Sequence, residues 1–373
     1  MKILLIYIFK FSLNFIYFFL KLFKTDNKKV LFITRQSDTI PLDFELLINS
    51  LKKEDNSLHI KIICKRMNKG LVNYIKYYLH IVYQMYHIAT SKVCVIDSYN
   101  VAICNLKHKK SLFVLQIWHS IGKIKKSGYQ TLDKESGRTE KIAKSLNMHK
   151  NYSKIIAGGP SFNKYYIESF NTTEDKILNY GLPRIDYLIN NEKTIRKKIL
   201  NKYNEFYNKK IVLYVPTFRT YKIDIDDFIK NFDFDNCILI IKCHPNQKIN
   251  IHNERVYTCD DFSSTDILTV SDYVITDYSS MCLEAAVLNK KLLFYVFDYD
   301  KYVDSNGLNL DPFIELSSCT YKDSKSILSI IKNDNYDDLS YQEFRKKYLP
   351  KKLGSSTKMI TDLILKEVRK WNI

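Results

Sequence analysis

Several classes of protein are excluded by what this sequence lacks. Its eight cysteines form no C-x-x-C pair and mostly lie inside apolar runs. We therefore interpret them as small buried residues of a protein from a reducing compartment, and we expect no zinc site. No internal repeat or low-complexity segment is present. Glycine is scarce, with 9 in 373 residues, while lysine, asparagine, isoleucine and tyrosine abound, so we assign part of the lysine content to background composition.

Acidic residues are also few. The chain has 58 Lys and Arg against 40 Asp and Glu, a formal charge of +18, which indicates acidic partners such as nucleic acid, anionic lipid or phosphate-bearing substrates. The positive charge is spread along the chain without a recognisable nucleic-acid-binding motif, so we expect no nucleic acid partner. The apolar content of 46% excludes a disordered chain, and the length favours two domains.

The amino terminus is apolar and aromatic over residues 1–24 and has no small-residue cleavage site, which excludes a secretory signal. Lys10 interrupts the run, and Lys21 and Lys24 close it, so a spanning helix is marginal. We predict an amphipathic helix in the membrane interface, with its lysines toward anionic headgroups, and a peripheral membrane protein. A first helix packed on the core is the alternative.

After this segment, buried strands alternate with helices. In the first half the strands are "KKVLFITRQ", "HIKIICKR", "KVCVID", "SLFVLQIW" and "KIIAGG"; in the second they are "KIVLYVPTFR", "CILIIKCHP", "RVYTCDD", "YVITDYSS" and "KLLFYVFD". Apolar strands that alternate with helices predict an α/β fold with mainly parallel sheets.

We place the domain boundary after "GLPRIDYLIN", where Gly181 and Pro183 break the rhythm. The predicted organisation is a Rossmann-like domain over residues 25–190, a second over 191–350, and a C-terminal helix over 351–373 that packs across both. Two doubly wound domains in series imply a ligand cleft at the carboxyl ends of their strands.

Polar residues follow otherwise apolar strands at five points, and we expect them to carry the chemistry. They are His119, then Thr217 and Arg219, then His244, then Thr276, Asp277, Ser279 and Ser280, and finally Asp298.

The "TDYSS" segment is the most informative of these strand ends. Ser279 and Ser280 occupy the first turn of the helix that follows, where backbone N–H groups point outward and suit an anion. Glu284 lies one turn further along, where a carboxylate accepts the hydroxyls of a ribose. Ordinary helix capping is the alternative for the serines, but it does not account for Glu284.

Arg219 and His244 are predicted to meet the same diphosphate from neighbouring strands. His244 is the second predicted catalytic residue, because an imidazolium offers a charge that counts for more as the leaving phosphate gains negative character; surface and turn positions are the alternative for both. Thr217, Thr276 and Asp277 are assigned to the same donor-binding side.

His119 is the predicted general base, because imidazole titrates near physiological pH. The lysines that follow it, Lys123, Lys125 and Lys126, are predicted to border the groove for an anionic acceptor, and a solvated loop is the alternative for each.

A set of motifs in this order resembles the CDP-glycerol glycerophosphotransferases of teichoic-acid and capsular polymer synthesis. The pieces, which span about residues 90 to 305, are "QIWHSIGKIKKSG", "GLPRIDYL", "VLYVPTFR", "IKCHP" and "SDYVITDYSSMCLEAAVLNKKLLFYVFDYDKY". Departures include Ser120-Ile121 in place of Gly-Thr, and "VDSNGLNLDP" in place of an Arg-Gly segment.

The resemblance implies a GT-B-type fold and a bacterial enzyme at the cytoplasmic face of the cell membrane. It implies transfer of glycerol phosphate from CDP-glycerol to a hydroxyl of a lipid-linked or polymeric acceptor, with release of CMP. By motif position His119 is the base, and the residues matched to donor-phosphate contacts are His244, Thr276, Ser279 and Ser280. No cofactor or metal site is implied, although a divalent cation could act through the donor diphosphate.

Three alternatives stay open. One is a GT-B glycosyltransferase that uses a nucleotide sugar such as CMP-sialic acid or a UDP-sugar, and another is a CDP-ribitol phosphotransferase. The third, from a different class, is a basic, non-catalytic membrane-surface protein in which His119 has no role.

Overall fold

The computed structural model describes residues 2–67, 70–219, 221, 225–243 and 253–370. It divides into two compact units, each built on a six-stranded sheet. The N-terminal unit contains residues 1–120, 127–184 and 355–373, and the C-terminal unit contains residues 121–126 and 185–354. The predicted α/β fold with two parallel sheets is confirmed.

The sheet of the N-terminal unit has the order β2-β1-β3-β4-β5-β6, and all its pairs are parallel. Its strands are β1 (Asp26–Thr34), β2 (His59–Cys64), β3 (Ser91–Ile96), β4 (Phe113–Gln116), β5 (Lys154–Ile156) and β6 (Ile177–Leu178). Every residue of β3 is buried, as its apolar sequence predicts for a central parallel strand. The chain leaves β1 toward β2 and returns to β3 on the other side of β1, so the β1/β3 boundary is the topological switch point.

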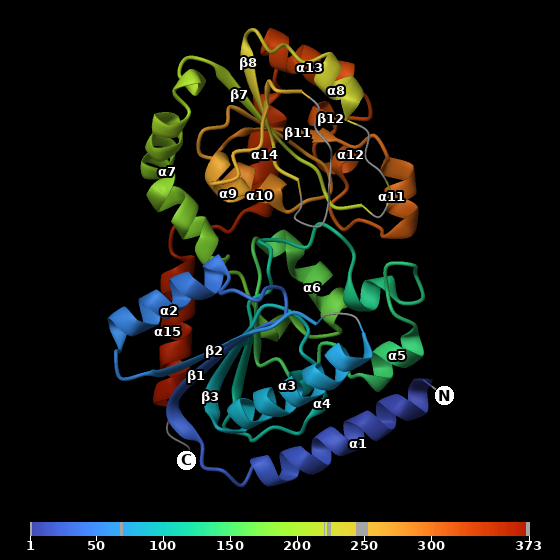
Figure 1. Ribbon diagram of the computed structural model, residues 1–373, viewed down its shortest axis with the longest axis vertical. Coiled ribbons are helices and arrows are strands. Elements are labelled where there is room, and N and C mark those ends of the chain that lie inside the picture. The colour runs from blue at the N-terminus through green and yellow to red at the C-terminus, as the bar shows by residue number, and fades with distance from the viewer. Residues whose placement is uncertain (1, 68–69, 220, 222–224, 244–252, 371–373) are drawn as a thin grey trace. The chain divides into compact units, whose positions relative to one another are not determined.

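Helices cover both faces of this sheet, and Figure 1 shows α3 and α15 on opposite sides of it. The helices are α1 (Lys2–Leu20), α2 (Leu42–Glu54), α3 (Leu71–Ala89), α4 (Val101–Asn105), α5 (Glu140–Ser145), α6 (Asn163–Phe170) and α15 (Ser356–Arg369). α15 contacts α2, β1 and β3, because its apolar stripe of Ile360, Ile364 and Val368 is buried. These contacts place the C-terminal helix in the N-terminal unit.

The "GLPR" segment is fixed to α2 by a buried ion pair. Arg184 donates through Nε and Nη2 to Asp43 Oδ2, at 2.9 and 2.5 Å, and its main-chain N–H donates to Asp43 Oδ1 at 2.9 Å. The long basic helix α7 (Pro183–Lys202) begins at Pro183, since proline suits the first position of a helix. The units separate between Arg184 and Ile185, before the predicted boundary at residue 190.

Helix α1 packs along the N-terminal unit with one edge and exposes apolar side chains with the other. It contacts α3 and α5, with Leu13 and Tyr17 buried, and Lys10 Nζ donates to Ser145 O at 2.7 Å. That hydrogen bond corrects the expectation that Lys10 points toward headgroups, because this lysine lies on the packed edge. By length and composition alone, Ile3–Leu20 could also cross a membrane.

The C-terminal unit has the sheet order β12-β11-β10-β7-β8-β9, again parallel throughout. Its strands are β7 (Lys210–Val215), β8 (Cys237–Ile241), β9 (Val256–Tyr257), β10 (Tyr273–Thr276), β11 (Lys291–Tyr295) and β12 (Thr320–Tyr321). Numbered along the unit, this is the 3-2-1-4-5-6 order of dinucleotide-binding folds, and its switch point lies between β7 and β10.

The helices of this unit pack in pairs on the sheet, α10 with α14 and α8 with α13. Besides α7 they are α8 (Asp226–Lys230), α9 (Ser264–Ile267), α10 (Met281–Val287), α11 (Tyr299–Ser305), α12 (Pro312–Glu315), α13 (Ser324–Asn333) and α14 (Asp338–Tyr348). The predicted helix after "TDYSS" is therefore α10.

The basic segment after His119 belongs to the C-terminal unit, although the predicted N-terminal domain contained it. Lys125 pairs with Leu308 in an antiparallel bridge, and Lys126 N–H donates to Gly307 O at 3.1 Å. A Cβ at Gly307, where φ is +81°, would lie 2.9 Å from Lys126 Cδ, so glycine permits this close approach. Residues 121–126 thus add to the second unit by long-range pairing that apolar periodicity does not reveal.

Candidate functional site

His119 stands just beyond β4, in the N-terminal unit, with its ring held by the end of the neighbouring strand. Nδ1 lies 3.1 Å from the main-chain oxygen of Asp97, which follows β3. A carbonyl oxygen only accepts, so Nδ1 carries the proton and Nε2 is the basic nitrogen of the neutral ring. The side chain is exposed. This orientation suits the predicted general base.

The turn that presents His119 is built on a residue in an unusual conformation. Trp118 has a φ of +60°, the left-handed region that a bulky side chain seldom occupies. Its N–H donates to Gln116 Oε1 at 2.9 Å, and Gln116 Nε2, fully buried, donates to Ser98 O at 3.1 Å. The Trp118 ring lies 4.2 Å from the His119 ring and 5.1 Å from Phe170. The surroundings therefore fix a strained turn that aims the imidazole.

Asp97 is a buried carboxyl beside this turn that the sequence reasoning missed. Burial raises its pKa to about 6, opposed by hydrogen bonds from the hydroxyls of Thr34 and Ser98, while the charge of Asp43 raises it further. The Ser98 hydroxyl lies 2.9 Å from Asp97 Oδ1. Its position at the end of "KVCVID", like that of His119 after its own strand, was the available signal.

In the C-terminal unit, the ends of β7 and β10 are joined at the switch point by a carboxylate. Both oxygens of Asp277 lie 3.0 Å from Thr217 N, and Oδ1 accepts from Tyr278 N at 2.6 Å. Asp277 is fully buried. Among the described residues, the buried Thr217 Oγ1 has no hydrogen-bond partner. A buried hydroxyl normally has one, which supports its predicted place at a ligand site.

Arg219 binds this strand end to the next one. Its Nη1 donates to Asp277 Oδ2 at 2.6 Å and to Thr217 O at 2.7 Å. Nε and Nη2 form a bidentate pair with Asp298, after β11, at 2.7 and 2.9 Å. The guanidinium of Arg219, which has five N–H donors, thus donates these four hydrogen bonds within the protein, so the geometry gives Arg219 a positioning role. Its contact with a donor diphosphate stays a prediction.

Aromatic rings surround the Arg219 guanidinium. Tyr278 and Tyr302 stack with centroids 3.9 Å apart, and the guanidinium lies 5.5 and 5.7 Å from those two centroids. Tyr278 and Tyr221 both donate hydroxyls to Asp298. Burial acts to raise the pKa of Asp298, but hydrogen bonds from Arg219 and Tyr221 outweigh it and the pKa falls below its usual range. Asp298 is therefore an anion whose charge serves the framework.

The predicted donor residues around β10 divide into buried and accessible ones. Thr276 Oγ1 donates to Val215 O at 2.8 Å, and Glu284 Oε2 accepts from Thr265 Oγ1 at 3.0 Å; Thr276 and Glu284 are both buried. Ser279 and Ser280, at the start of α10, are half-buried. Ser279 and Ser280 are thus the residues of this segment that a ligand can reach. One carboxylate oxygen of Glu284 is already engaged in a hydrogen bond within the protein.

The lysines predicted to border the acceptor groove lie in three different environments. Lys123 is 2% exposed, and burial places its pKa well below the usual range. Lys125 Nζ lies 5.6 Å from the Tyr302 centroid; burial lowers its pKa to about 8, the charge of Asp277 opposes this, and the charge of Arg219 adds to it. Lys126 is half-buried. Lys125 therefore belongs with the predicted donor residues, and the acceptor contacts stay predictions.

His244, the second predicted catalytic histidine, lies outside the described residues. Within the described part of the chain, no group of three or more His, Cys, Asp and Glu side chains is placed to hold a metal ion. Six of the eight cysteines are buried, while Cys64 and Cys243 are half-buried, in line with their interpretation as small apolar residues.

Asp97→Asn should flatten one part of the pH dependence of stability. Because the folded pKa of about 6 exceeds the ordinary value of 3.8, the folded state binds this proton more tightly. That contribution is complete below about pH 4 and is lost as the pH rises through 6, a difference of about 3 kcal/mol. Thermal melts at pH 4.5 and pH 7 should show the variant gaining stability relative to the native chain at the higher pH. Parallel shifts at both values would contradict the assignment.

Comparisons with known proteins agree with this geometry. A family model described as CDP-glycerol:poly(glycerophosphate) glycerophosphotransferase matches residues 15–366. The chain is 28% identical over 359 residues to a teichoic acid ribitol-phosphate primase of Bacillus spizizenii, covering 92% of each chain. It is 27% identical to a teichoic acid glycerol-phosphate primase of Bacillus subtilis, covering 70% of each.

The fold has relatives among solved structures. The wall teichoic acid polymerase TagF superposes with a TM-score of 0.75 at 18% identity, covering 96% of this chain and 94% of that one. The chain spans 58% of a poly(ribitol-phosphate) polymerase of Bacillus spizizenii, to which it is 28% identical. The family model covers both sheets and every described strand-end residue discussed above. The chain belongs to the CDP-glycerol:poly(glycerophosphate) glycerophosphotransferase family and is a CDP-alcohol phosphotransferase of teichoic-acid synthesis.

Proposed function

We propose that this enzyme transfers glycerol phosphate from CDP-glycerol to a hydroxyl of a lipid-linked or polymeric acceptor and releases CMP. The observation that supports the proposal is the switch point of the C-terminal sheet. There Thr217 follows β7, Ser279 and Ser280 follow β10 at the start of α10, and the ion pairs of Arg219 fix the two strand ends. Open parallel sheets bind nucleotides at such points. Family membership favours this phosphotransferase over the nucleotide-sugar glycosyltransferase alternative.

The chemistry follows from a base and a site for the leaving phosphate. The acceptor hydroxyl attacks the β-phosphorus of the donor, its proton passes to Nε2 of His119, and the bond from the β-phosphorus to the bridging oxygen breaks. CMP leaves with that oxygen and its electron pair. The transition state of such a transfer is loose, so catalysis comes from positioning and charge neutralisation. Lys125 and the Ser279–Ser280 turn are the proposed sources of that neutralisation.

CDP-ribitol is the second candidate donor. The relative matched over 92% of this chain is named a ribitol-phosphate primase, whereas the glycerol-phosphate primase of Bacillus subtilis is matched over 70%. Both donors present the same CDP group, so the residues described above serve either one.

Membrane attachment through α1 is also proposed. The outer edge of this helix exposes Phe11, Phe15 and Phe18, with 74, 60 and 61% of their surface accessible. A row of exposed phenylalanines on one helix edge fits insertion into the headgroup region of a bilayer. We propose accordingly that the protein lies at the cytoplasmic face of the cell membrane, where a CDP-activated donor and a lipid-linked acceptor meet.

The donor is tested by CMP release from CDP-glycerol, CDP-ribitol, UDP-sugars and CMP-sialic acid, each with a crude lipid-linked acceptor. CMP should appear with CDP-glycerol. His119→Ala should lower kcat by about 10²- to 10⁴-fold without a change in donor KM, because it removes a general base. His59→Ala, which removes another exposed histidine of the same unit, is the matched control. Release from CDP-ribitol alone would move the proposal to the second candidate, and full activity of His119→Ala would remove the base.

The charge of Lys125 should set an alkaline limit on donor use. With a pKa of about 8 the side chain is cationic below that pH and neutral above it, so kcat/KM for the donor should fall about tenfold per pH unit above pH 8. Lys125→Arg should hold kcat/KM level there, because a guanidinium stays charged. Lys325→Arg, at an exposed position of the same unit, serves as the control and should leave the native profile unchanged. Identical profiles for the native chain and Lys125→Arg would show that another group sets the limit.

Flotation with phosphatidylglycerol vesicles tests the role of α1. Phe11→Ser together with Phe15→Ser should weaken vesicle binding by roughly tenfold or more, because two large apolar side chains no longer insert. The control is Ile314→Ser with Leu339→Ser, two residues of the C-terminal unit that are 77 and 76% exposed. Equal flotation of both double variants would refute insertion of α1.

A further inference from the structure

A cavity of about 240 Å³ lies in the N-terminal unit at the switch point of its sheet. Arg35, which follows β1, and Tyr99 and Asn100, which follow β3, contribute to its wall. Carboxyl ends of parallel strands at a switch point are where open α/β sheets bind ligands. The predicted donor site lies at the switch point of the other unit's sheet, so we expect a second ligand to fit this cavity.

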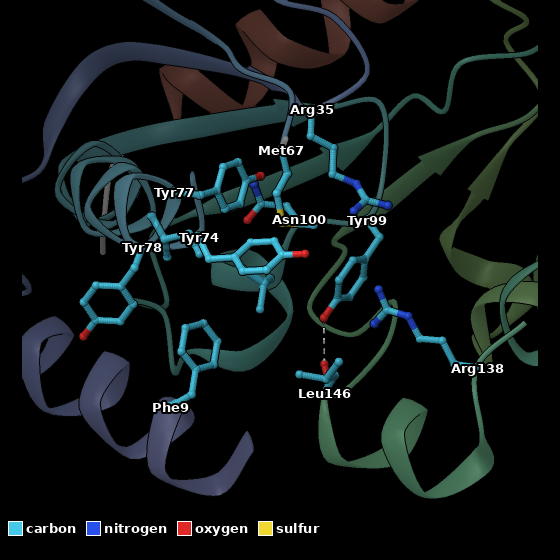
Figure 2. Close-up of a pocket in the computed structure, with 12 residues that line it drawn as sticks. Phe9, Arg35, Met67, Tyr74, Tyr77, Tyr78, Tyr99, Asn100, Arg138 and Leu146 are labelled. Atoms are coloured by element: carbon cyan, nitrogen blue, oxygen red, sulfur yellow. Dashed lines mark hydrogen bonds between the residues drawn. The ribbon is translucent and has the colours of Figure 1, made fainter. Parts of the chain in front are cut away.

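One side of the cavity is aromatic and is built by two helices. Figure 2 shows Tyr74, Tyr77 and Tyr78 of α3 along this side, with Phe9 of α1 below them. Phe9 and Tyr78 meet edge to face with centroids 5.9 Å apart. Such a wall accepts an apolar chain, because rings offer large contact area with little loss of side-chain freedom.

The other side of the cavity is cationic. The guanidinium carbons of Arg35 and Arg138 lie 5.6 and 5.2 Å from the Tyr99 centroid, and Figure 2 shows both arginines beside that ring. No acidic side chain lines the cavity within the described part of the chain, and neither arginine forms an ion pair there. Arg138 Nη1 is buried and has no hydrogen-bond partner among the described residues. A buried donor of this kind is stabilised by an anion with several acceptor oxygens.

The aromatic side continues onto exposed apolar surface. α3 exposes Val72, Ile75 and Leu79, and Tyr74 is both exposed and part of the cavity wall. α1, which contacts α3, exposes its phenylalanines along the neighbouring edge. The order of chemistry on this unit is therefore exposed apolar helices, aromatic wall, then paired arginines, which matches a lipid tail followed by a phosphate.

The loop that contributes Tyr99 to the cavity wall also holds the predicted base, His119. Tyr99 lies two positions after Asp97, whose main-chain oxygen holds Nδ1 of His119. The short loop after β3 thus forms one wall of the cavity and fixes the imidazole. A phosphate at Arg35 and Arg138 would therefore lie beside Tyr99, a residue of the same loop that holds His119.

We propose that the cavity binds the lipid carrier of the acceptor. Its phosphate or diphosphate lies between Arg35 and Arg138, the first part of its apolar chain lies against Tyr74, Tyr78 and Phe9, and its hydroxyl-bearing group continues toward His119. The proposal rests on the proposed function in one respect, that the acceptor is lipid-linked. The anionic head of such a lipid fits the cationic side of the cavity, and its apolar chain fits the aromatic side.

Binding of farnesyl diphosphate to the full-length protein, measured by isothermal titration calorimetry with CMP present to occupy the donor site, tests the assignment. Farnesyl diphosphate should bind at least about tenfold more tightly than inorganic pyrophosphate or farnesol, because only the first uses both sides of the cavity. Arg35→Gln with Arg138→Gln should weaken its binding by about tenfold for each arginine.

Lys53→Gln with Lys110→Gln removes two exposed charges of the same unit outside the cavity and should bind like the native chain. Arg35→Gln alone, at an exposed position, should give a loss of about tenfold even where the double variant fails to fold. Tighter or equal binding of pyrophosphate, or equal loss in the lysine control, would overturn the proposal. This readout is independent of turnover, so absence of CMP release from every donor would refute the proposed function and leave the cavity result standing.

Discussion

The arrangement of the C-terminal unit depends on one buried guanidinium. Arg219 joins the ends of β7, β10 and β11 through Asp277 and Asp298, and the side chains of the two carboxylates are 0 and 7% exposed. Removing one partner of such a network leaves an uncompensated buried charge, which costs several kcal/mol, about 3–5 for a buried pair. The serines at the start of α10 keep their position because Asp277, two residues earlier, is held from two sides.

The same network limits what Arg219 can offer a substrate. Its N–H groups face Asp277, Asp298 and the oxygen of Thr217, so we propose that a donor diphosphate is neutralised by neighbouring side chains instead. Lys125 is one cation beside the cluster, and the segment of residues 121–126 brings it there. Burial lowers the pKa of Lys125 to about 8, the charge of Asp277 opposes this shift, and the charge of Arg219 adds to it, which leaves the pKa within reach of physiological pH.

The sequence predicted the strands and their ends well, because buried parallel strands are apolar throughout and the residue that follows each one is conspicuous when polar. It did not predict partners. Asp277 and Asp298 lie 58 and 79 positions from Arg219, and no local pattern links them. The prediction that residues 121–126 belong to the N-terminal domain was wrong for the same reason. This segment pairs with Gly307 and Leu308, which are far away in the sequence.

The two units use arginine in opposite ways, and Arg35 and Arg219 each follow the first strand of their own unit. Arg219 has carboxylate partners, so its charge is neutralised within the protein and serves geometry. Arg35 and Arg138 stand beside Tyr99 without an acidic partner in the described chain, so their neutralisation has to come from outside. Arg35 is exposed, but Nη1 of Arg138 is buried and has no hydrogen-bond partner in the described chain, a cost that a bound anion would offset. Arg219 therefore has a structural role in positioning the strand ends, whereas Arg35 and Arg138 have the role of binding the proposed anionic ligand.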